Sequence, residues 1–411
     1  MIVAMLDDSD FALIGLPESM LALHTTHLER HWKGVDPYDF VWKLSKLLPA
    51  RYGEPLYYMI DGYLGLSLTD SSVVRKVMGI EPHHDAKALA VFARAYSLLD
   101  DRGPVHSSTQ FAVQLCRLVW SLRNQKTHYP SWGLSFPWRT SIGQVLPANS
   151  PTSLITSLAG LAFLETHLKS RIDDFLEYSR LCAQYLVEEN GFSEDSRGIC
   201  FYYSPLVSER ITNASAIVAM FLNSLARVTA DRELRGLSDR AYEFVVNTQH
   251  SYGGWNYFPD RETRLHLVDN YHTGFILESL LRYTGPINER VKRASINGIT
   301  FYTKMFTSQG VPINSLGSRY PIDAHDFAQG LIVFSLGKSS VPGAGQLLQR
   351  IWSYGRSSFL KPDGTFRSRI YRYGRSAASF PRWADAWIFL GMTEAYRSLL
   401  PPPELGGDRN G

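Results

Sequence analysis

Apolar residues recur every three or four positions along most of the chain after residue 85. The stretch from Ala88 to Leu99 is typical, with leucine, valine, phenylalanine and tyrosine at helical spacing and alanines between them. This spacing predicts successive helices of about fifteen residues each. No segment alternates between apolar and polar residues as a half-buried strand does, so we expect an all-α protein.

The helical segments belong to a repeat of roughly 55 to 60 residues. Each unit has a turn rich in glycine and aromatic residues, a polar start leading into an apolar helix, and an amphipathic helix. The turns are residues 131–136, 198–202, 253–257 and 363–367, and the polar starts are 150–152, 212–213, 269–272, 323–326 and 382–385. Alternating apolar and amphipathic helices predict an (α/α) toroid of about five to six helical hairpins, with an inner and an outer ring; a solenoid is the alternative.

The chain divides by pattern into three parts. Residues 1–85 are irregular and rich in proline and aromatic residues, so we expect an N-terminal extension packed on the toroid. Residues 86–400 carry the repeat, and residues 401–411 predict a disordered tail. In a toroid all inner helices start at one end, where their free amide groups favour anionic ligands. We therefore expect a funnel-shaped site at that end.

Composition and charge narrow the function classes. A net charge of +3 over 411 residues is too small to indicate a nucleic-acid partner. The three cysteines are scattered, which predicts buried thiols, and no membrane span or signal peptide is recognisable, so we expect a cytoplasmic protein. Aromatic residues make up 13% of the chain, a surplus that suits the stacking of rings on sugars. The oligomeric state stays open.

Acid and base candidates gather at the polar helix starts. They are Asp269, His272, Asp323, His325, Asp326 and Asp385. Carboxylates and imidazoles at this density suit general acid and base catalysis, whereas Asp269 and Asp385 equally suit helix capping. No His-x-x-x-His or Cys-x-x-Cys spacing is present, so we predict no metal and no cofactor.

The aromatic turns and the last helix starts supply candidates for substrate binding. They are Trp132, Trp138, Tyr202, Tyr203, Trp255, Tyr257, Asn270, Tyr271, Arg369, Tyr371, Arg372, Trp383 and Trp387. The aromatic rings suit packing against sugars, and the arginines suit bidentate binding of a carboxylate. If these arginines face the funnel, the partner is an acidic oligo- or polysaccharide.

Four segments carry a resemblance to a known group of proteins. Residues 252–256, 269–275, 320–325 and 382–387 resemble six-hairpin glycosidase-like proteins of surface-polysaccharide clusters, over roughly residues 130 to 400. Asn213, followed by alanine, is similar to a helix start in the C-terminal domain of glucuronyl carbon-5 epimerases. The resemblance implies an α/α toroid that acts on carbohydrate, with Asn213 in substrate binding.

A second resemblance is to the toroid of terpenoid cyclases and prenyltransferases, whose glutamine and Gly-Trp repeat is similar to residues 248–255. The acid cluster of those enzymes is missing, because Asp100 and Asp101 lack the further acid. The first hypothesis is therefore an enzyme acting on a uronic-acid-containing polysaccharide by epimerisation, elimination or hydrolysis, and the sequence does not choose among them. A non-catalytic glycan-binding or scaffold protein is the alternative.

Overall fold

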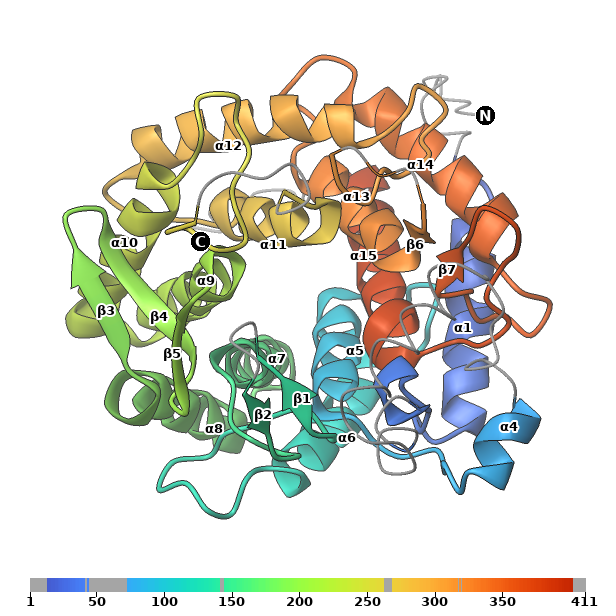
Figure 1. Ribbon diagram of the computed structural model, residues 1–411, viewed down its shortest axis with the longest axis horizontal. Coiled ribbons are helices and arrows are strands. Elements are labelled where there is room, and N and C mark those ends of the chain that lie inside the picture. Colours follow the sequence, from blue (N-terminus) through green and yellow to red (C-terminus); the bar gives the residue numbers. More distant parts are fainter. Residues whose placement is uncertain are drawn as a thin grey trace, which may run out of the picture.

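A computed structural model describes residues 13–40, 43, 72–140, 144–261, 268–316, 318 and 320–401. Its helices form two concentric rings, which confirms the predicted all-α toroid (Figure 1). In the described part of the chain, six helices form the inner ring, and each packs on the next until the last meets the first. They are α5 (Ala86–Leu98), α7 (Ser153–Ser170), α9 (Thr212–Thr229), α11 (Asn270–Leu281), α13 (Ala324–Leu336) and α15 (Ala386–Leu399).

The outer ring consists of the amphipathic helices that follow the inner ones in the chain. They are α6 (Ser108–Ser121), α8 (Asp173–Gln184), α10 (Arg232–Asn247), α12 (Asn288–Tyr302) and α14 (Ala344–Phe359). The N-terminal helix α1 (Leu16–Glu29) packs against α15 and so completes the sixth pair. The short helix α4 (Ser72–Val77) also precedes the repeat. Of the predicted tail, residues 401–411, all but residue 401 lie outside the described residues.

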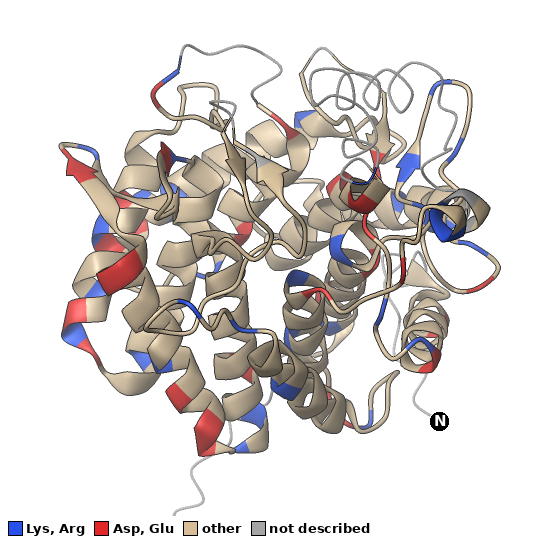
Figure 2. Ribbon diagram, turned by 60° about the horizontal axis from the view of Figure 1, so that its bottom comes forward, with Lys and Arg blue, Asp and Glu red and all other residues tan. Residues whose placement is uncertain are grey.

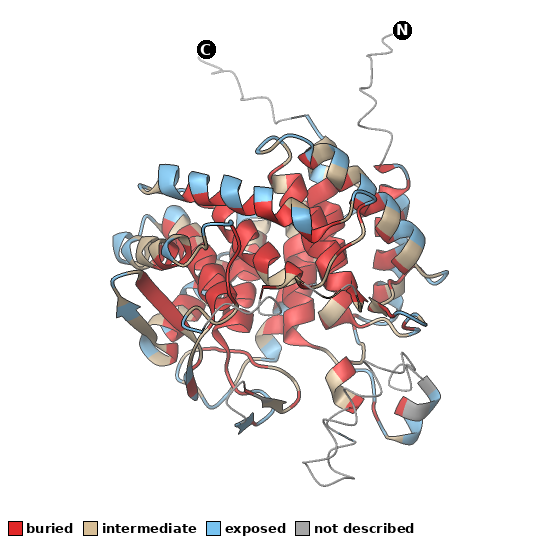
Figure 3. Cartoon of the chain, turned by 45° about the horizontal axis from the view of Figure 1, so that its top comes forward, coloured by how far each residue is buried: buried red, intermediate tan, exposed pale blue. Residues whose placement is uncertain are grey.

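Inner and outer helices differ in how much of their surface is buried (Figure 3). Every residue of α7 from Ser153 to Leu164 is buried, because neighbours cover the helix on all sides. In α10 only one stripe is buried, at Ser238, Ala241, Tyr242, Phe244 and Val245, and charged residues occupy the outer helices and loops (Figure 2). The periodicity of the sequence thus determines which ring a helix joins.

Side-chain caps fix the starts of four inner helices. Asp85, Thr152, Asp269 and Asp323 each accept a hydrogen bond from a backbone N–H in the first turn of the helix that follows. Such caps stabilise a helix by about 1 kcal/mol each. Close packing between inner helices depends on Gly160, because a Cβ there would lie 2.4 Å from the Phe221 ring of α9. Three of the five polar starts predicted from the sequence thus carry a side-chain cap, at Thr152, Asp269 and Asp323, whereas α9 and α15 begin without one.

The turns between helices contain short antiparallel strands that the apolar pattern did not predict. The strands are β1 (Trp138–Arg139), β2 (Val145–Leu146), β3 (Phe192–Asp195), β4 (Gly198–Ser204), β5 (Val207–Arg210), β6 (Ile322–Asp323) and β7 (Arg369–Ile370). β1 pairs with β2, β4 pairs with both β3 and β5, and β6 pairs with β7. Several have only two residues, too few to show an alternating pattern.

Further short helical segments lie among the described residues. They include the π-helices η4 (Tyr185–Asn190) and η7 (Pro381–Asp385) and the 3-10 helix η6 (Thr303–Met305). Of these, η7 leads directly into α15 and carries two of the predicted site residues. Among the described helices, none is both long enough and apolar enough to cross a bilayer.

Candidate functional site

The N-terminal ends of the inner helices meet at one end of the ring, which we call the mouth. Lys87 at the start of α5 places its Nζ 5.8 Å from the ring centre of Phe275 in α11 and 5.4 Å from that of Trp387 in α15. The ring of Tyr271 in α11 lies 4.7 Å from His325 at the start of α13. The inner helices therefore run parallel, and side chains from distant parts of the sequence share one site.

Asp269 and His272 form a coupled pair at the start of α11. One carboxylate oxygen accepts the backbone N–H of His272 at 2.9 Å, and the other lies 2.6 Å from its Nδ1. The carboxylate favours the tautomer with a proton on Nδ1, which leaves Nε2 as the acceptor. The His272 side chain is 20% exposed. Asp269 is thus both a helix cap and an orienting partner, and His272 suits the role of a general base.

His325 lies deeper in the mouth, inside a group of aromatic rings. It stacks on Tyr271 and also contacts Phe275, Trp383 and Trp387 with ring centres 5.1 to 5.7 Å away. Neither ring nitrogen has a hydrogen-bond partner among the described residues, although the side chain is only 1% exposed. Burial is the main cause that lowers the pKa of His325 well below 6.5, so the imidazole is neutral.

Asp323 is held by neighbours on three sides. It caps α13 and accepts hydrogen bonds from Arg369 Nε at 2.9 Å and from Trp383 Nε1 at 2.9 Å. The pairing of β6 with β7 brings Arg369 opposite Asp323. The sequence placed Asp323 in one catalytic group with His325 and Asp326, but its contacts suit a residue that orients Arg369 and Trp383.

Asp326 is completely buried one turn further along α13. One of its oxygens accepts a hydrogen bond from Asn314 Nδ2 at 2.9 Å. Burial, followed by the nearby charge of Asp323, raises the pKa of Asp326 well above 3.8. This shift favours the protonated carboxyl of Asp326, the form that can donate a hydrogen bond or a proton.

Asp385 is placed elsewhere, in the contact between α1 and α15. Its oxygens accept hydrogen bonds from the backbone N–H of Phe366 at 3.1 Å and from the Ser379 hydroxyl, and one lies 3.0 Å from His27 Nε2. The side chain is fully buried. These contacts suit a structural role, in which Asp385 joins the N-terminal helix to the last inner helix.

Four mouth residues were not predicted from the sequence. Asp36 and Arg382 form a buried bidentate ion pair, and Tyr38 stacks on Phe136 at 5.4 Å and lies against Trp383. The segment around residues 36–40 therefore reaches the mouth from the N-terminal region. Lys87 is the fourth. The sequence does single it out, because Lys87 and Arg94 are the charged residues of an otherwise apolar inner helix.

The predicted aromatic residues separate into two groups. Tyr203, Trp138, Tyr257, Tyr271, Trp383 and Trp387 contact one another or the histidines at the mouth. Trp132 and Trp255 instead bond the last turn of the preceding outer helix, through Nε1 to the carbonyls of Val119 and Val245. These two tryptophans are buried, so they anchor the turns to the outer ring.

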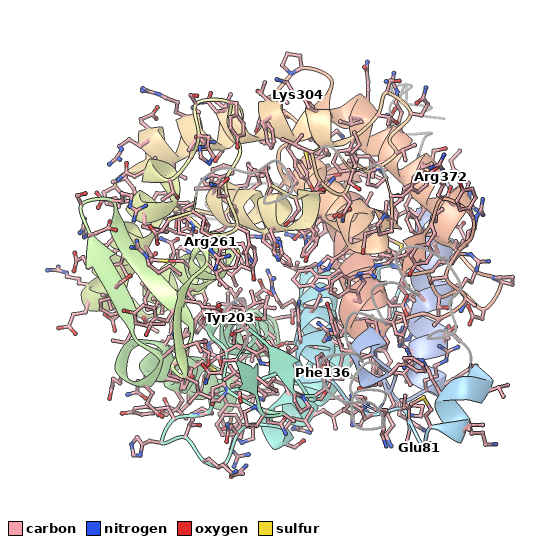
Figure 4. All side chains as sticks on the ribbon, viewed as in Figure 1. Glu81, Phe136, Tyr203, Arg261, Lys304 and Arg372 are labelled. Carbon is pink, nitrogen blue, oxygen red and sulfur yellow. The ribbon has the colours of Figure 1, made fainter. Side chains whose placement is uncertain are left out.

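The remaining predicted binding residues also lie in different places. Asn213 is buried at the start of α9, and its Oδ1 has no partner among the described residues. Asn270 is used structurally, between Tyr302 and the carbonyl of Met305. Tyr202 lies against Gly191, where a Cβ would be 3.6 Å from its ring. Figure 4 shows Tyr203 and Phe136 toward the inside of the ring and Arg372 near its edge.

Tyr371 and Arg372 belong to the last aromatic turn, between β7 and η7. Tyr371 is 8% exposed, and its backbone N–H donates to the carbonyl of Gly374. The guanidinium of Arg372 lies over the ring of Tyr373, which is itself 80% exposed. Arg369 is thus the predicted arginine of this turn that contacts the mouth, through Asp323 and Trp383.

Burial keeps the tyrosines of the mouth in their neutral form. It raises the pKa of Tyr203 to about 12 and also raises the pKa values of Tyr38, Tyr257 and Tyr271. Neutral phenols donate hydrogen bonds, which suits the hydroxyl groups of a sugar. Within the described ranges, no group of three or more His, Cys, Asp or Glu residues is arranged to hold a metal ion.

No family model matches the sequence, and a search of curated proteins finds no match. Solved structures do share the fold. The cellobiose 2-epimerase from Spirochaeta thermophila superimposes with a TM-score of 0.61 at 13% identity, covering 86% of this chain and 98% of that one. A family 88 glycosyl hydrolase from Bacteroides vulgatus gives 0.58 at 10% identity over 77% and 94%.

A polysaccharide lyase is similar to the same extent, with a TM-score of 0.57 at 11% identity over 77% of this chain and 92% of the lyase. At these identities the likeness establishes the fold and does not transfer an activity. The chain is therefore an (α/α) toroid similar in fold to enzymes named as an epimerase, a hydrolase and a lyase.

Proposed function

We propose that this protein is a carbohydrate-active enzyme that moves a proton to and from a sugar carbon next to a carbonyl or carboxyl group. The observation that carries the proposal is the pair of unlike histidines on either side of one tyrosine. His272 is oriented by Asp269, His325 is neutral and unpaired, and the ring of Tyr271 lies 4.0 Å from the first and 4.7 Å from the second.

This arrangement divides the chemistry between two groups. His272 takes the proton through Nε2, while Asp269 stabilises the imidazolium that forms. His325, as a neutral imidazole, offers one donor and one acceptor to the developing oxygen charge or to the opposite face of the carbon. The tyrosines and tryptophans of the mouth hold the sugar ring and its hydroxyl groups.

The fold supports this class of reaction without selecting a substrate. Proteins of the same fold are named as a cellobiose 2-epimerase and a polysaccharide lyase, and both names denote changes at a carbon that loses a proton. The mouth therefore suits epimerisation or elimination. A cofactor is not needed for either, because the base and the donors are supplied by the chain.

Hydrolysis has less support from the contacts. It requires two carboxyl groups that flank the bond, about 5 Å apart for retention or 6.5 to 9.5 Å for inversion. Asp323 is bonded to Arg369 and Trp383, and Asp385 is bonded within the α1–α15 contact. Asp326 suits the acid, but a free carboxylate to act with it is not among the candidates from the sequence.

The charge of the glycan is the finer part of the proposal. Arg369 and Arg382 bring guanidinium groups to the mouth, which favours a uronic acid. Asp323 and Asp36 already pair with them, which reduces the surplus of positive charge. We propose two substrate classes, acidic glycans and neutral reducing sugars. The cytoplasmic location stays a prediction.

Incubation in deuterated water tests the reaction class directly. The protein is mixed with uronic-acid oligosaccharides, their carboxyl-reduced counterparts and neutral reducing disaccharides, and the products are analysed by NMR and mass spectrometry. Deuterium at carbon 2 or carbon 5 with an unchanged chain means epimerisation, and a new double bond means elimination. We expect one of these two products with the wild-type protein and neither with the His272→Asn variant.

Two outcomes would contradict the proposal. A new reducing end without deuterium on carbon would indicate hydrolysis and shift attention to Asp326. Saturable binding with no chemical change would favour a glycan-binding or scaffold protein. Retention of the acidic over the reduced oligosaccharides, weakening as salt is raised, would support the acidic class.

A further inference from the structure

Lys87 occupies an unusual position for a lysine. It is the second residue of α5, it is 7% exposed, and its Nζ lies over the rings of Phe275 and Trp387. No hydrogen bond or ion pair to its Nζ is recorded among the described residues. Most buried cations are paired with an acid, so a buried amine that is surrounded by aromatic rings instead indicates a functional role.

The other basic residues near α5 show the contrast. Arg94, two turns further along the same helix, pairs with Glu165 and Glu278 at 3.2 and 3.1 Å. Lys169 of α7 donates to the Ser108 hydroxyl at 3.1 Å and lies 4.0 Å from Asp101. Lys87 therefore differs from Arg94 and Lys169 in forming no ion pair among the described residues.

Two acids lie near Lys87, and neither forms an ion pair with it; Oδ2 of Asp85 has no hydrogen-bond partner among the described residues. Asp85 caps α5 through the N–H of Ala88, and Asp36 forms the bidentate pair with Arg382. Burial, followed by the charge of Arg382, lowers the pKa of Lys87 to about 7. A large fraction of the protein therefore carries a free amine at this position at neutral pH, and the free amine is the nucleophilic form.

His325 adjoins the same two rings as the amine. The ring centres of Phe275 and Trp387 lie 5.3 and 5.1 Å from that of His325. The positive charge of Lys87 is also the second cause, after burial, that lowers the pKa of His325. An amine and an unpaired imidazole thus adjoin the same two aromatic rings.

We propose that Lys87 forms an imine with the open-chain carbonyl of a reducing sugar. The inference rests on the proposed function and names its substrate class. The amine lone pair attacks carbon 1, the resulting carbinolamine loses water, and the imine nitrogen carries a proton. That positive charge makes the hydrogen on carbon 2 more acidic, and a mouth histidine removes it and returns it to the other face. Hydrolysis by one water then releases the epimer and restores the amine.

The chemistry uses groups that the mouth already provides. The aromatic rings exclude water from the imine, and His272 or His325 acts as the base. Oxygen of the sugar leaves as water and returns from water, so no oxidant or reductant enters the cycle. The imine also explains why a cation-forming group lies among aromatic rings, since a protonated imine is attracted to their faces.

Reductive trapping tests the imine in the wild-type protein. Glycolaldehyde, and separately glucose and cellobiose, are added with sodium cyanoborohydride at pH 7, and modified lysines are located by peptide mass mapping. We expect Lys87 to be labelled at least about tenfold faster than the exposed Lys33 or the paired Lys169. The alditols of the same sugars, which lack the carbonyl, should give no adduct. Labelling of Lys87 no faster than Lys33 would overturn the inference.

Two variants separate the imine from a purely electrostatic role. Lys87→Arg keeps a positive charge and Lys87→Met keeps the length, and neither can form an imine. We expect each to lose the adduct and to reduce deuterium incorporation at carbon 2 at least about 100-fold, while Lys169→Arg keeps both. Circular dichroism and the melting temperature check the fold of each variant. Retained incorporation in Lys87→Arg would overturn the inference.

The two proposals can fail separately. Deuterium exchange at carbon 2 without an adduct on Lys87 refutes the imine and leaves the proton-transfer enzyme standing. An adduct without exchange confirms a reactive amine and refutes the proposed function. Deuterium at carbon 5 of a uronic acid, with no adduct, supports the acidic substrate class and overturns the imine.

Discussion

Two buried polar regions lie at opposite ends of the same inner helices, and their bonding differs. At the C-terminal ends, a charged cluster joins α5, α7, α11 and α15. Its members are Arg94, Glu165, Glu278, Arg282, Glu394 and Arg397. Three basic and three acidic groups balance there. The arginines that end α11 and α15 also face the negative ends of the helix dipoles.

The mouth shows the opposite condition. The imidazole of His325 and the amine of Lys87 have no hydrogen-bond or ion-pair partner among the described residues, and burial raises the pKa of Asp326. Unpaired buried groups cost stability, typically about 1 to 3 kcal/mol each. A fold tolerates this cost where the groups serve a ligand. The comparison therefore indicates a structural role for the charged cluster and supports the proposed chemical role of the mouth.

The largest expected effect is the loss of activity when the mouth pair is removed. His272→Asn and Asp269→Asn should lower turnover about 10²- to 10⁴-fold, because general base catalysis contributes about that much. The rate of deuterium incorporation into the sugar measures it. Asp269→Glu is the matched control and should retain part of the activity. A melting temperature close to that of the wild type separates chemistry from unfolding, and full activity in both Asn variants would exclude the pair.

The second effect is on stability and concerns the charged cluster. Glu278→Gln removes the carboxylate that pairs Arg94 at 3.1 Å and Arg282 at 3.2 Å, and it leaves Arg94 fully buried with one partner. Breaking a buried pair costs about 3 to 5 kcal/mol, measured by urea unfolding. Glu177→Gln, in an exposed pair with Arg180, is the control and should change stability by less than about 1 kcal/mol. Equal losses of unfolding free energy in the two variants would show that the charged cluster is no more important for stability than a surface pair.

The third effect has the opposite sign, because Lys87 costs stability while it is charged. The pKa of Lys87 falls from 10.5 in the unfolded chain to about 7 when folded, so between these values the unfolded chain binds more protons. The wild type thus gains stability as pH rises through this window. Lys87→Met should be more stable by about 2 to 4 kcal/mol at pH 6, with the gain shrinking by pH 9. A stability gain in Lys87→Met that does not change with pH would contradict the lowered pKa of Lys87.

The fourth effect is smaller and concerns the unpaired imidazole. His325→Phe should stabilise the protein by about 1 kcal/mol at pH 7, since it removes two orphaned nitrogens from an aromatic site. The folded pKa of His325 is depressed, so wild-type stability is lost as pH falls below 6.5. The variant lacks that loss, and its advantage should grow at pH 5. Thermal unfolding at both pH values measures it, and destabilisation would show that the nitrogens have partners.

The sequence was sufficient for features that depend on local spacing. Apolar periodicity separated inner helices such as α7 from outer helices such as α10, and polar caps located the starts at Asp269 and Asp323. Because every inner helix starts at the same end, the caps also indicated where side chains would meet. For this reason the sequence alone indicates His272 and His325 as candidates.

Features that depend on distant contacts were not predictable in this way. Trp132 and Trp255 have the composition of sugar platforms, but their partners are carbonyls in the preceding outer helices. Asp36 reaches Arg382 across 346 positions in the chain. Lys87 had a local signal, a charge on an otherwise apolar helix, although only the ring of helices shows which aromatic residues surround it.

The smallest expected effect is that of chelation, which should be absent. Within the described residues, no group of three or more acids, histidines and cysteines is arranged to hold a metal ion. Asp269 contacts Nδ1 of His272 and leaves Nε2 open, but a catalytic metal site usually needs about three protein ligands. Prolonged dialysis against EDTA should therefore leave deuterium exchange and the melting temperature unchanged. Loss of exchange that one divalent ion restores would mean that the mouth pair is a metal site, and would reassign His272 from base to ligand.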